Sequence, residues 1–216
     1  MNNQAKPVIV LSRQLPEMFT AALAQLGEVR VAGAEPDDKL LEGASVYLAT
    51  GIDPVPAELI ARFGPGLGLI ANVATSTDHI DLRAASARGL AVSNTPVVTE
   101  DTADLAMALL LATCSRLCFC ERALRACDWT RGAGQLGLSV HGKVLGIVGL
   151  GAIGQALARR AAGFGMSILY HGPSRKLGAE ADLDVQYRAS LEDLLAESDI
   201  VSLNCPLTES SRHLLN

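Results

Sequence analysis

The sequence has no excess of positive charge. Its 18 Lys and Arg residues stand against 23 Asp and Glu residues, which leaves a formal net charge of -5. A protein that coats nucleic acid neutralises phosphates with clustered Lys and Arg side chains. We therefore do not expect nucleic acid as a partner.

Long hydrophobic runs are also absent. The longest unbroken apolar run extends from Leu105 to Ala112, far short of the roughly 20 residues that cross a bilayer. Apolar residues nonetheless make up 49% of the 216 residues, which suits a protein that buries about 70% of its unfolded surface. The composition predicts a globular protein with no membrane partner, built as one large domain or two small ones.

The cysteines lack partners for disulfides or metal sites. Four of the five lie in one apolar segment: Cys114, Cys118, Cys120 and Cys127, with Cys205 apart from them. An odd number clustered on one predicted helix indicates reduced thiols and hence a cytoplasmic protein. Cys114 and Cys118 could share a helix face, yet no second Cys or His pair completes a tetrahedral site. We expect no metal.

From Val8 onward, short apolar runs alternate with segments of helical periodicity, as is typical of βα units in a parallel sheet. The predicted strands are Val8–Leu11, Glu28–Val31, Ser45–Ala49, Leu67–Val73 and Leu90–Ser93. The predicted helices between them are Pro16–Leu26, Pro36–Leu41, Pro56–Phe63 and Asp81–Arg88. These elements define a first domain over residues 1–98. A single open sheet running through the whole chain is the alternative.

The segment from Thr99 to Cys127 is longer than the other predicted helices and contains neither Gly nor Pro. Acidic residues lie in its first turns and arginines near its end, as the helix dipole favours. We therefore predict one long interdomain helix over residues 99–127. Its run from Leu105 to Ala112 is apolar on every face, so we expect it to be covered by a second domain or a second subunit. A connecting loop is predicted from Asp128 to Val140.

A second βαβαβ run follows in a third region, residues 128–216. The predicted elements are strand Val144–Val148, helix Ile153–Gly163, strand Ser167–Tyr170, helix Ser190–Glu197 and strand Ile200–Asn204. Ser190 and Asp193 form a capping box at the start of the last helix. Such a run is half of a six-stranded dinucleotide-binding fold, in which the first strand is central. With only this half, we expect Val144–Val148 to lie at the sheet edge.

Gly149, Gly151 and Gly154 form a G-x-G-x-x-G motif between a predicted strand and a predicted helix. The first Gly permits a tight turn, the second lets a pyrophosphate approach the backbone, and the third lets helix and strand pack closely. The phosphates are then held at the helix N-terminus. The motif predicts a dinucleotide cofactor; glycines that serve only a tight turn are the alternative.

The segment after the next strand indicates which dinucleotide is bound. An NAD site typically has a carboxylate about 20 residues after the motif, where it binds the ribose 2′-hydroxyl. This chain has Ser174, Arg175 and Lys176 there instead. A hydroxyl and two cations suit a 2′-phosphate, so we favour NADP over NAD. Ordinary solvated loop charges are the alternative.

The sequence resembles the D-isomer-specific 2-hydroxyacid dehydrogenases and, among them, the glyoxylate and hydroxypyruvate reductases. The resemblance runs through nearly the whole chain and rests on residues 72–82, 94–96, 102–106, 108–112, 142–154, 163–166 and 198–203. It implies a flavodoxin-like substrate domain followed by the first half of a Rossmann NAD(P)-binding domain, both with parallel sheets. It also implies a cleft in which the cofactor reduces a small 2-oxo acid, and a homodimer formed through the nucleotide domain.

The resemblance implies several site residues. Backbone amides of Thr75 and Ser76 would hold the substrate carboxylate, and the family usually has Gly where this chain has Ser76. Ala152 and Ile153 would meet the pyrophosphate, and the family often has Arg in place of Ala152. The other positions implied to lie along the cofactor are Thr102, Cys205, Pro206 and Ser211. Cys205 also follows a predicted parallel strand, whose carboxyl end is where such sheets bind ligands.

No catalytic residue is assigned within these 216 residues. Ketone reduction needs a proton donor, a cation that holds the substrate carboxylate, and a carboxylate that orients the donor. The resemblance implies a His, an Arg and a Glu, all at positions beyond Asn216. The histidines present are interpreted as surface or loop residues: His79, His141, His171 and His213. We expect a truncated, inactive dehydrogenase; a non-catalytic dinucleotide-binding pseudoenzyme and a corepressor-like binding module are the alternatives.

Overall fold

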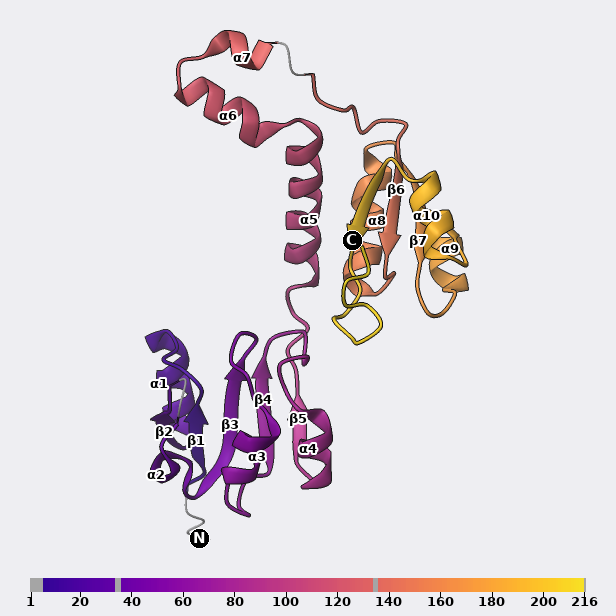
Figure 1. The fold of residues 1–216 in the computed structure, drawn as a ribbon. Helices are drawn as coiled ribbons and strands as arrows, with labels where there is room; N and C mark the ends of the chain where they lie inside the picture. Colours follow the sequence, from indigo (N-terminus) through magenta and orange to yellow (C-terminus); the bar gives the residue numbers. More distant parts are fainter. Residues whose placement is uncertain (1–5, 34–35, 134–135, 216) are drawn as a thin grey trace. The chain divides into compact units, whose positions relative to one another are not determined.

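The structure is a computed structural model that describes residues 6–33, 36–133 and 136–215. The chain divides between Val97 and Val98 into two compact units. Each unit has its own sheet, and every strand pair in both sheets is parallel (Figure 1). The α/β prediction with two parallel sheets is confirmed, and the single continuous sheet is wrong.

The first unit has five strands in the order β2-β1-β3-β4-β5, which is the flavodoxin-like order. The strands are β1 (Val8–Leu11), β2 (Glu28–Val31), β3 (Ala44–Thr50), β4 (Leu69–Val73) and β5 (Ala91–Ser93). The helices between them are α1 (Glu17–Leu26), α2 (Asp38–Leu41), α3 (Ala57–Arg62) and α4 (Leu82–Ala87). All nine lie where the apolar runs and helical periods predict them, with ends shifted by at most two residues.

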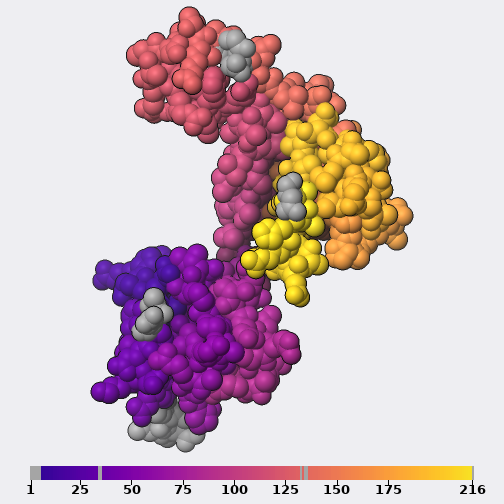
Figure 2. Space-filling model, in the orientation of Figure 1, coloured from indigo at the N-terminus to yellow at the C-terminus, as the bar shows by residue number. Residues whose placement is uncertain are grey.

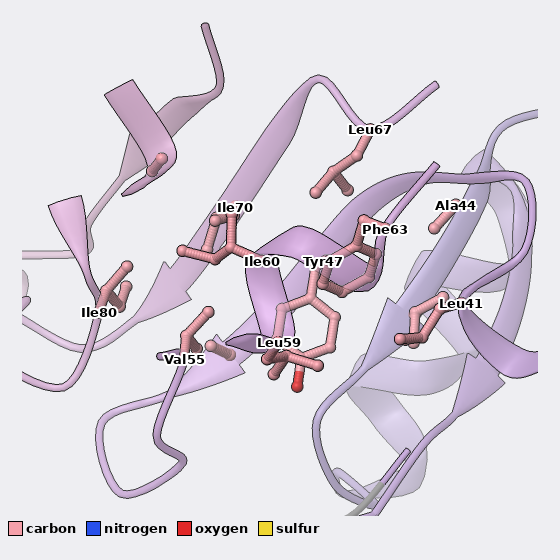
Figure 3. Close-up of a cluster of buried hydrophobic side chains, with 13 residues drawn as sticks. Leu41, Ala44, Tyr47, Val55, Leu59, Ile60, Phe63, Leu67, Ile70 and Ile80 are labelled. Carbon is pink, nitrogen blue, oxygen red and sulfur yellow. The ribbon is translucent and has the colours of Figure 1, made fainter. Parts of the chain in front are cut away.

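Both faces of the first sheet are covered, as parallel sheets require. On one face Tyr47 of β3 packs against Phe63, with ring centroids 5.0 Å apart, and Ile60 of α3 is fully buried beside them (Figure 3). On the other face Ile9 and Leu11 of β1 pack with Leu23 of α1. The two apolar layers hold β1, β3 and β4 in register, so their carboxyl ends lie along one edge.

The second unit has four strands in the order β8-β7-β6-β9. The strands are β6 (Val144–Val148), β7 (Ser167–His171), β8 (Val185–Tyr187) and β9 (Ile200–Leu203). The helices are α5 (Thr99–Cys114), α6 (Leu117–Arg125), α7 (Trp129–Ala133), α8 (Ala152–Gly163), α9 (Leu177–Leu183) and α10 (Leu191–Glu197). The Ser190 hydroxyl accepts the Asp193 N–H at 3.0 Å, which confirms the predicted cap of α10.

The prediction that Val144–Val148 lies at the sheet edge is wrong. This strand, β6, pairs with β7 on one side and β9 on the other. The sequence interpretation missed the short strand β8, which is the third strand of the fold. Ile200–Leu203 is therefore the fourth strand and crosses to the free side of β6, so the edges are β8 and β9. The sheet thus contains one strand more than the predicted half.

The prediction of one long helix over residues 99–127 is also wrong. Helix α5 ends at Cys114, and α6 starts at Leu117 with its axis bent by 63°. Arg116 between them has φ +54°, a left-handed conformation that ends a helix without Gly or Pro. The returning chain takes the freed carbonyl: Leu138 donates its N–H to Cys114 O at 2.8 Å. At Gly137 a Cβ would lie 2.6 Å from the same oxygen.

The predicted loop from Asp128 to Val140 contains the short helix α7. The Asp128 carboxylate accepts the Arg131 N–H at 3.0 Å and so satisfies an orphan donor of the first turn. Residues 134–135 of this loop lie outside the described residues.

Candidate cofactor and substrate sites

The glycine motif makes the turn from β6 into α8. Gly149 has φ +95°, and a Cβ there would lie 2.7 Å from the backbone N of Cys205. A Cβ on Gly154 would come within 3.0 Å of Gly149 O, so helix and strand approach too closely for any side chain. Gly151, in contrast, has nothing within 4 Å of its Cβ position. The motif therefore leaves open space at the start of α8, where unpaired N–H groups favour an anion.

The loops that follow β6, β7 and β9 meet above the carboxyl ends of the second sheet. Gly149 donates its N–H to His171 O at 2.8 Å, and Asn204 donates to Val148 O at 2.8 Å. These bonds bring Cys205 beside the glycine turn. The Ser211 hydroxyl donates to Pro206 O at 2.7 Å and accepts the Thr208 N–H at 2.7 Å, which closes the following loop on itself. This edge is where a doubly wound sheet reverses its strand order and binds ligands.

Thr102 lies on α5, where its hydroxyl donates to Val98 O at 2.7 Å. It lines a cavity of about 420 Å³ together with Leu105 and Leu109 of the same helix and residues 200–204 at β9. The structure thus brings Thr102 to the same side of the second unit as the end of β9.

Ser174, Arg175 and Lys176 follow β7 at the start of α9. Arg175 does not stand free: its Nε lies 2.9 Å from Glu180 Oε1 and its Nη2 lies 2.8 Å from Glu180 Oε2. The Tyr170 hydroxyl donates to the same carboxylate at 2.6 Å and accepts the Lys176 N–H at 2.7 Å. The guanidinium and then the Tyr170 hydroxyl hold the pKa of Glu180 at about 2, below its usual 4.5.

Glu180 was missed by the sequence interpretation. Its signal was its place five residues after Arg175, which became meaningful only once a helix was known to begin at Leu177.

The substrate loop, residues 74–78, follows β4 in the first unit and contains Thr75 and Ser76, the two predicted substrate-binding residues. The carbonyl oxygens of Ala74, Thr75 and Ser76 each accept a hydrogen bond from a residue outside the loop. Asn72 Nδ2 donates to Ser76 O at 2.6 Å, Asn94 Nδ2 donates to Thr75 O at 2.9 Å, and Thr95 N donates to Ala74 O at 3.0 Å. The backbone N–H groups of Thr75, Ser76 and Thr77 have no partner within the described ranges. Such a row of free donors suits a carboxylate.

A buried carboxylate stands beside this loop. Asp53 accepts hydrogen bonds from Ser12 and Thr50, both at 2.6 Å, and from the Arg13 guanidinium, with Nε at 2.9 Å. These hydrogen bonds lower the pKa of Asp53, and the bond from Arg13 has the largest effect. Burial raises the pKa of Tyr47 to about 12, and the negative charge of Asp53 contributes a smaller part of this increase. A Cβ on Gly51 would lie 2.8 Å from the Ala74 Cβ, so the Asp53 loop and the substrate loop adjoin.

The histidines differ in their surroundings. His213 is exposed and has φ +55°, whereas His171 ends β7 and its Nδ1 lies 3.0 Å from Arg188 O. His79 Nε2 lies 3.2 Å from Asn72 Oδ1, at the substrate loop. His171 and His79 are both half-buried, and His171 belongs to a strand, so the interpretation of all four as surface or loop residues is wrong for His171.

Metal-ligand clusters and single membrane-spanning helices are both absent from the described residues. In the parts of the chain that the structure describes, no group of three His, Cys, Asp or Glu side chains could hold a metal ion. Taken singly, no described helix is long and apolar enough to cross a membrane, although the bent pair α5 and α6 meets that test together by length and composition.

Comparison with known proteins matched residues 107–216 to the model of the D-isomer specific 2-hydroxyacid dehydrogenase, NAD binding domain. The chain is 41% identical to a glyoxylate reductase of Pyrococcus horikoshii over 98% of its own length and 66% of the relative's. The chain therefore spans about two thirds of the length of such relatives.

Solved structures of two relatives share the fold. One is an NADPH-dependent glyoxylate/hydroxypyruvate reductase from Sinorhizobium meliloti in complex with NADP and malonate, with TM-score 0.84, 33% identity, and coverage of 96% of this chain and 65% of that one. The other is a D-lactate dehydrogenase from Aquifex aeolicus complexed with NAD and lactic acid, with TM-score 0.85, 26% identity, and coverage of 97% and 63%.

Proposed function

The chain belongs to the D-isomer-specific 2-hydroxyacid dehydrogenase family, and we propose that it binds NADP and a small 2-oxo acid for reduction to the 2-hydroxy acid. The observation that carries this proposal is the turn between β6 and α8. There Gly149 and Gly154 are required by close packing, whereas Gly151 leaves the space that a pyrophosphate would occupy. The similarity to glyoxylate reductases supports glyoxylate or hydroxypyruvate as the oxo acid.

The proposed cofactor-binding residues lie in the second unit, and the proposed substrate-binding residues lie in the first. In the second unit the amides at Ala152 and Ile153 would hold the pyrophosphate, with Thr102, Cys205, Pro206 and Ser211 along the rest of the dinucleotide. When bound, the nicotinamide supplies the hydride. In the first unit the amides of Thr75 and Ser76 would hold the carboxylate of the oxo acid and so orient its ketone.

NADP rather than NAD is favoured by charge. Arg175 and Lys176 lie beyond the end of β7, where the 2′-substituent of the ribose binds in this fold. Glu180 accepts hydrogen bonds from Nε and Nη2 of Arg175. Among residues 136–215, the two N–H groups on Nη1 of Arg175 have no partner. Those two donors, the Lys176 ammonium and the Ser174 hydroxyl would bind a phosphate.

We propose that these 216 residues, tested as they stand, bind NADPH without turnover, because the resemblance assigns none of them the role of the family's catalytic His, Arg or Glu. The test is NADPH binding by fluorescence, followed by NADPH consumption with glyoxylate or hydroxypyruvate. Binding without consumption is expected. Absence of NADPH binding would contradict the cofactor assignment, and NADPH consumption would contradict the proposed inactivity. A non-catalytic dinucleotide-binding or corepressor-like module is the second candidate; NADPH-dependent capture of a partner protein would favour it.

We also propose a homodimer that assembles through α6 and α7. Leu117, Leu124 and Trp129 are more than half exposed there and line a cavity of about 450 Å³. Helices α6 and α7 form the salmon part of the surface in Figure 2. Large exposed apolar side chains around one hollow are typical of a protein interface. Leu124→Asp should lower the sedimentation coefficient to that of a monomer. Leu26→Asp, at an equally exposed leucine of α1, should not.

The five unpaired cysteines support a reducing, cytoplasmic setting.

A further inference from the structure

Asn72 connects the scaffold to the substrate loop. It is 1% exposed, on β4. Its Nδ2 donates to Ser76 O at 2.6 Å and to Ala74 O at 3.3 Å, and its Oδ1 faces His79 Nε2 at 3.2 Å. Turning the amide over would place Oδ1 against two carbonyl oxygens, which repel it. One orientation of the Asn72 amide therefore holds the loop carbonyls at both ends of Thr75.

His79 secures that orientation. Because Asn72 Oδ1 can only accept, His79 Nε2 must carry the proton. His79 Nδ1 is buried, and no described residue contacts it within hydrogen-bond distance. A proton on Nδ1 would be a buried donor without an acceptor, so burial of Nδ1 favours the Nε2–H tautomer over the Nδ1–H tautomer.

The His79 backbone is itself fixed. Val55 donates its N–H to His79 O at 2.8 Å, and Asp81 donates to Val55 O at 3.0 Å. Val55 is fully buried in the core of the first unit. The His79 backbone is therefore held by the core at Val55, and its imidazole is held by Asn72.

We propose that His79 and Asn72 are positioning residues, which hold the loop carbonyls so that the amides of Thr75 and Ser76 stay free for the substrate carboxylate. This inference rests on the proposed carboxylate site. His79 acts through Asn72 and transfers no proton. It fixes the donors before the substrate binds, and a site prepared in advance loses less entropy on binding.

The first measurement needs no ligand. Long-range proton–nitrogen NMR spectra of the full chain report the His79 tautomer, and the Nε2–H form is expected in the wild type. The Nδ1–H form would overturn the proposal. In His79→Leu the Asn72 side-chain amide resonances should move, because Oδ1 has lost its donor. His79→Gln supplies an amide donor and should restore them.

The second measurement uses oxamate as the probe. In the wild type the amide resonances of Thr75, Ser76 and Thr77 should shift on titration. His79→Leu should raise the apparent Kd at least fivefold, and His79→Gln should bring it back to within about twofold of the wild type. The control, His213→Leu, changes an exposed histidine of the second unit and should have no effect.

The possible failures separate. Equal oxamate affinity in wild type and His79→Leu would overturn the positioning role while the carboxylate site stands. No shift of the three amides in the wild type would overturn the carboxylate site, and the positioning role with it.

Discussion

The Arg175 guanidinium lies against the Glu180 carboxylate, with Nε 2.9 Å from Oε1 and Nη2 2.8 Å from Oε2. Arg175 also lies over the Tyr187 ring, 5.9 Å from its centroid. Glu180 thus holds one edge of a cation that is 58% exposed. The proposal that the other edge binds a ribose 2′-phosphate makes the proposed preference for NADPH depend on Arg175.

Arg175→Gln should weaken NADPH binding tenfold or more, about 1.4 kcal/mol, and leave NADH binding nearly unchanged. Titration with each dinucleotide measures both values. Glutamine is the better replacement because Arg175→Glu would place a second carboxylate beside Glu180. Arg188→Gln is the matched control, since Arg188 pairs with Glu197 elsewhere in the second unit. Equal losses for NADPH and NADH would contradict the assignment.

Glu180 also predicts a pH dependence of stability. Its pKa in the folded protein is about 2, below the ordinary 4.5. A carboxyl with a depressed folded pKa stabilises the fold above its unfolded pKa and loses that contribution as the pH falls through the folded value. The difference in urea midpoint between wild type and Glu180→Gln should therefore be constant above pH 4.5 and shrink toward pH 2. A difference that is independent of pH over this window would show that the ion pair does not act on folding.

The glycine motif predicts opposite effects at two positions. Gly154→Ala should destabilise the second unit by about 1–3 kcal/mol, because the added methyl meets the Gly149 carbonyl. Gly151→Ala should leave the Tm unchanged, since its methyl enters open space at an ordinary φ of -81°. It should nonetheless weaken NADPH binding. Unaltered NADPH affinity in Gly151→Ala would remove the pyrophosphate from that space.

Asp53 predicts a stability effect in the first unit. Asp53→Asn removes the charge that Arg13 faces and should lower the free energy of unfolding by about 2 kcal/mol. The slowest-exchanging amides of β1 and β3 measure that change. Asp38→Asn is the control, because Asp38 pairs with Arg62 at 78% exposure and should cost less than about 1 kcal/mol. Similar losses in the two variants would mean that burial adds nothing to the Asp53 interaction.

Much of the fold was predictable because its signals are local. The apolar runs at Val8–Leu11 and Val144–Val148 each fill a strand that is buried on both faces, so they read as strands without any partner. The glycine spacing 149, 151 and 154 follows from how tightly β6 turns into α8. The Ser190 cap likewise involves atoms only three residues apart.

Other features depend on contacts that separation along the chain conceals. Strand β8 has three residues and no apolar run, and missing it reversed the expected position of β6. The break at Arg116 has no Gly or Pro to mark it, and the carbonyl freed at Cys114 accepts the N–H of Leu138, which is 24 residues further along the chain. Asp53 meets Arg13 across 40 positions. Propensity and periodicity determined most of the elements, and residue spacing determined the glycine motif, because these signals act within one turn or strand. Strand order, the helix break and the carboxylate partners were decided only by tertiary structure, because packing alone brings those residues within hydrogen-bonding distance.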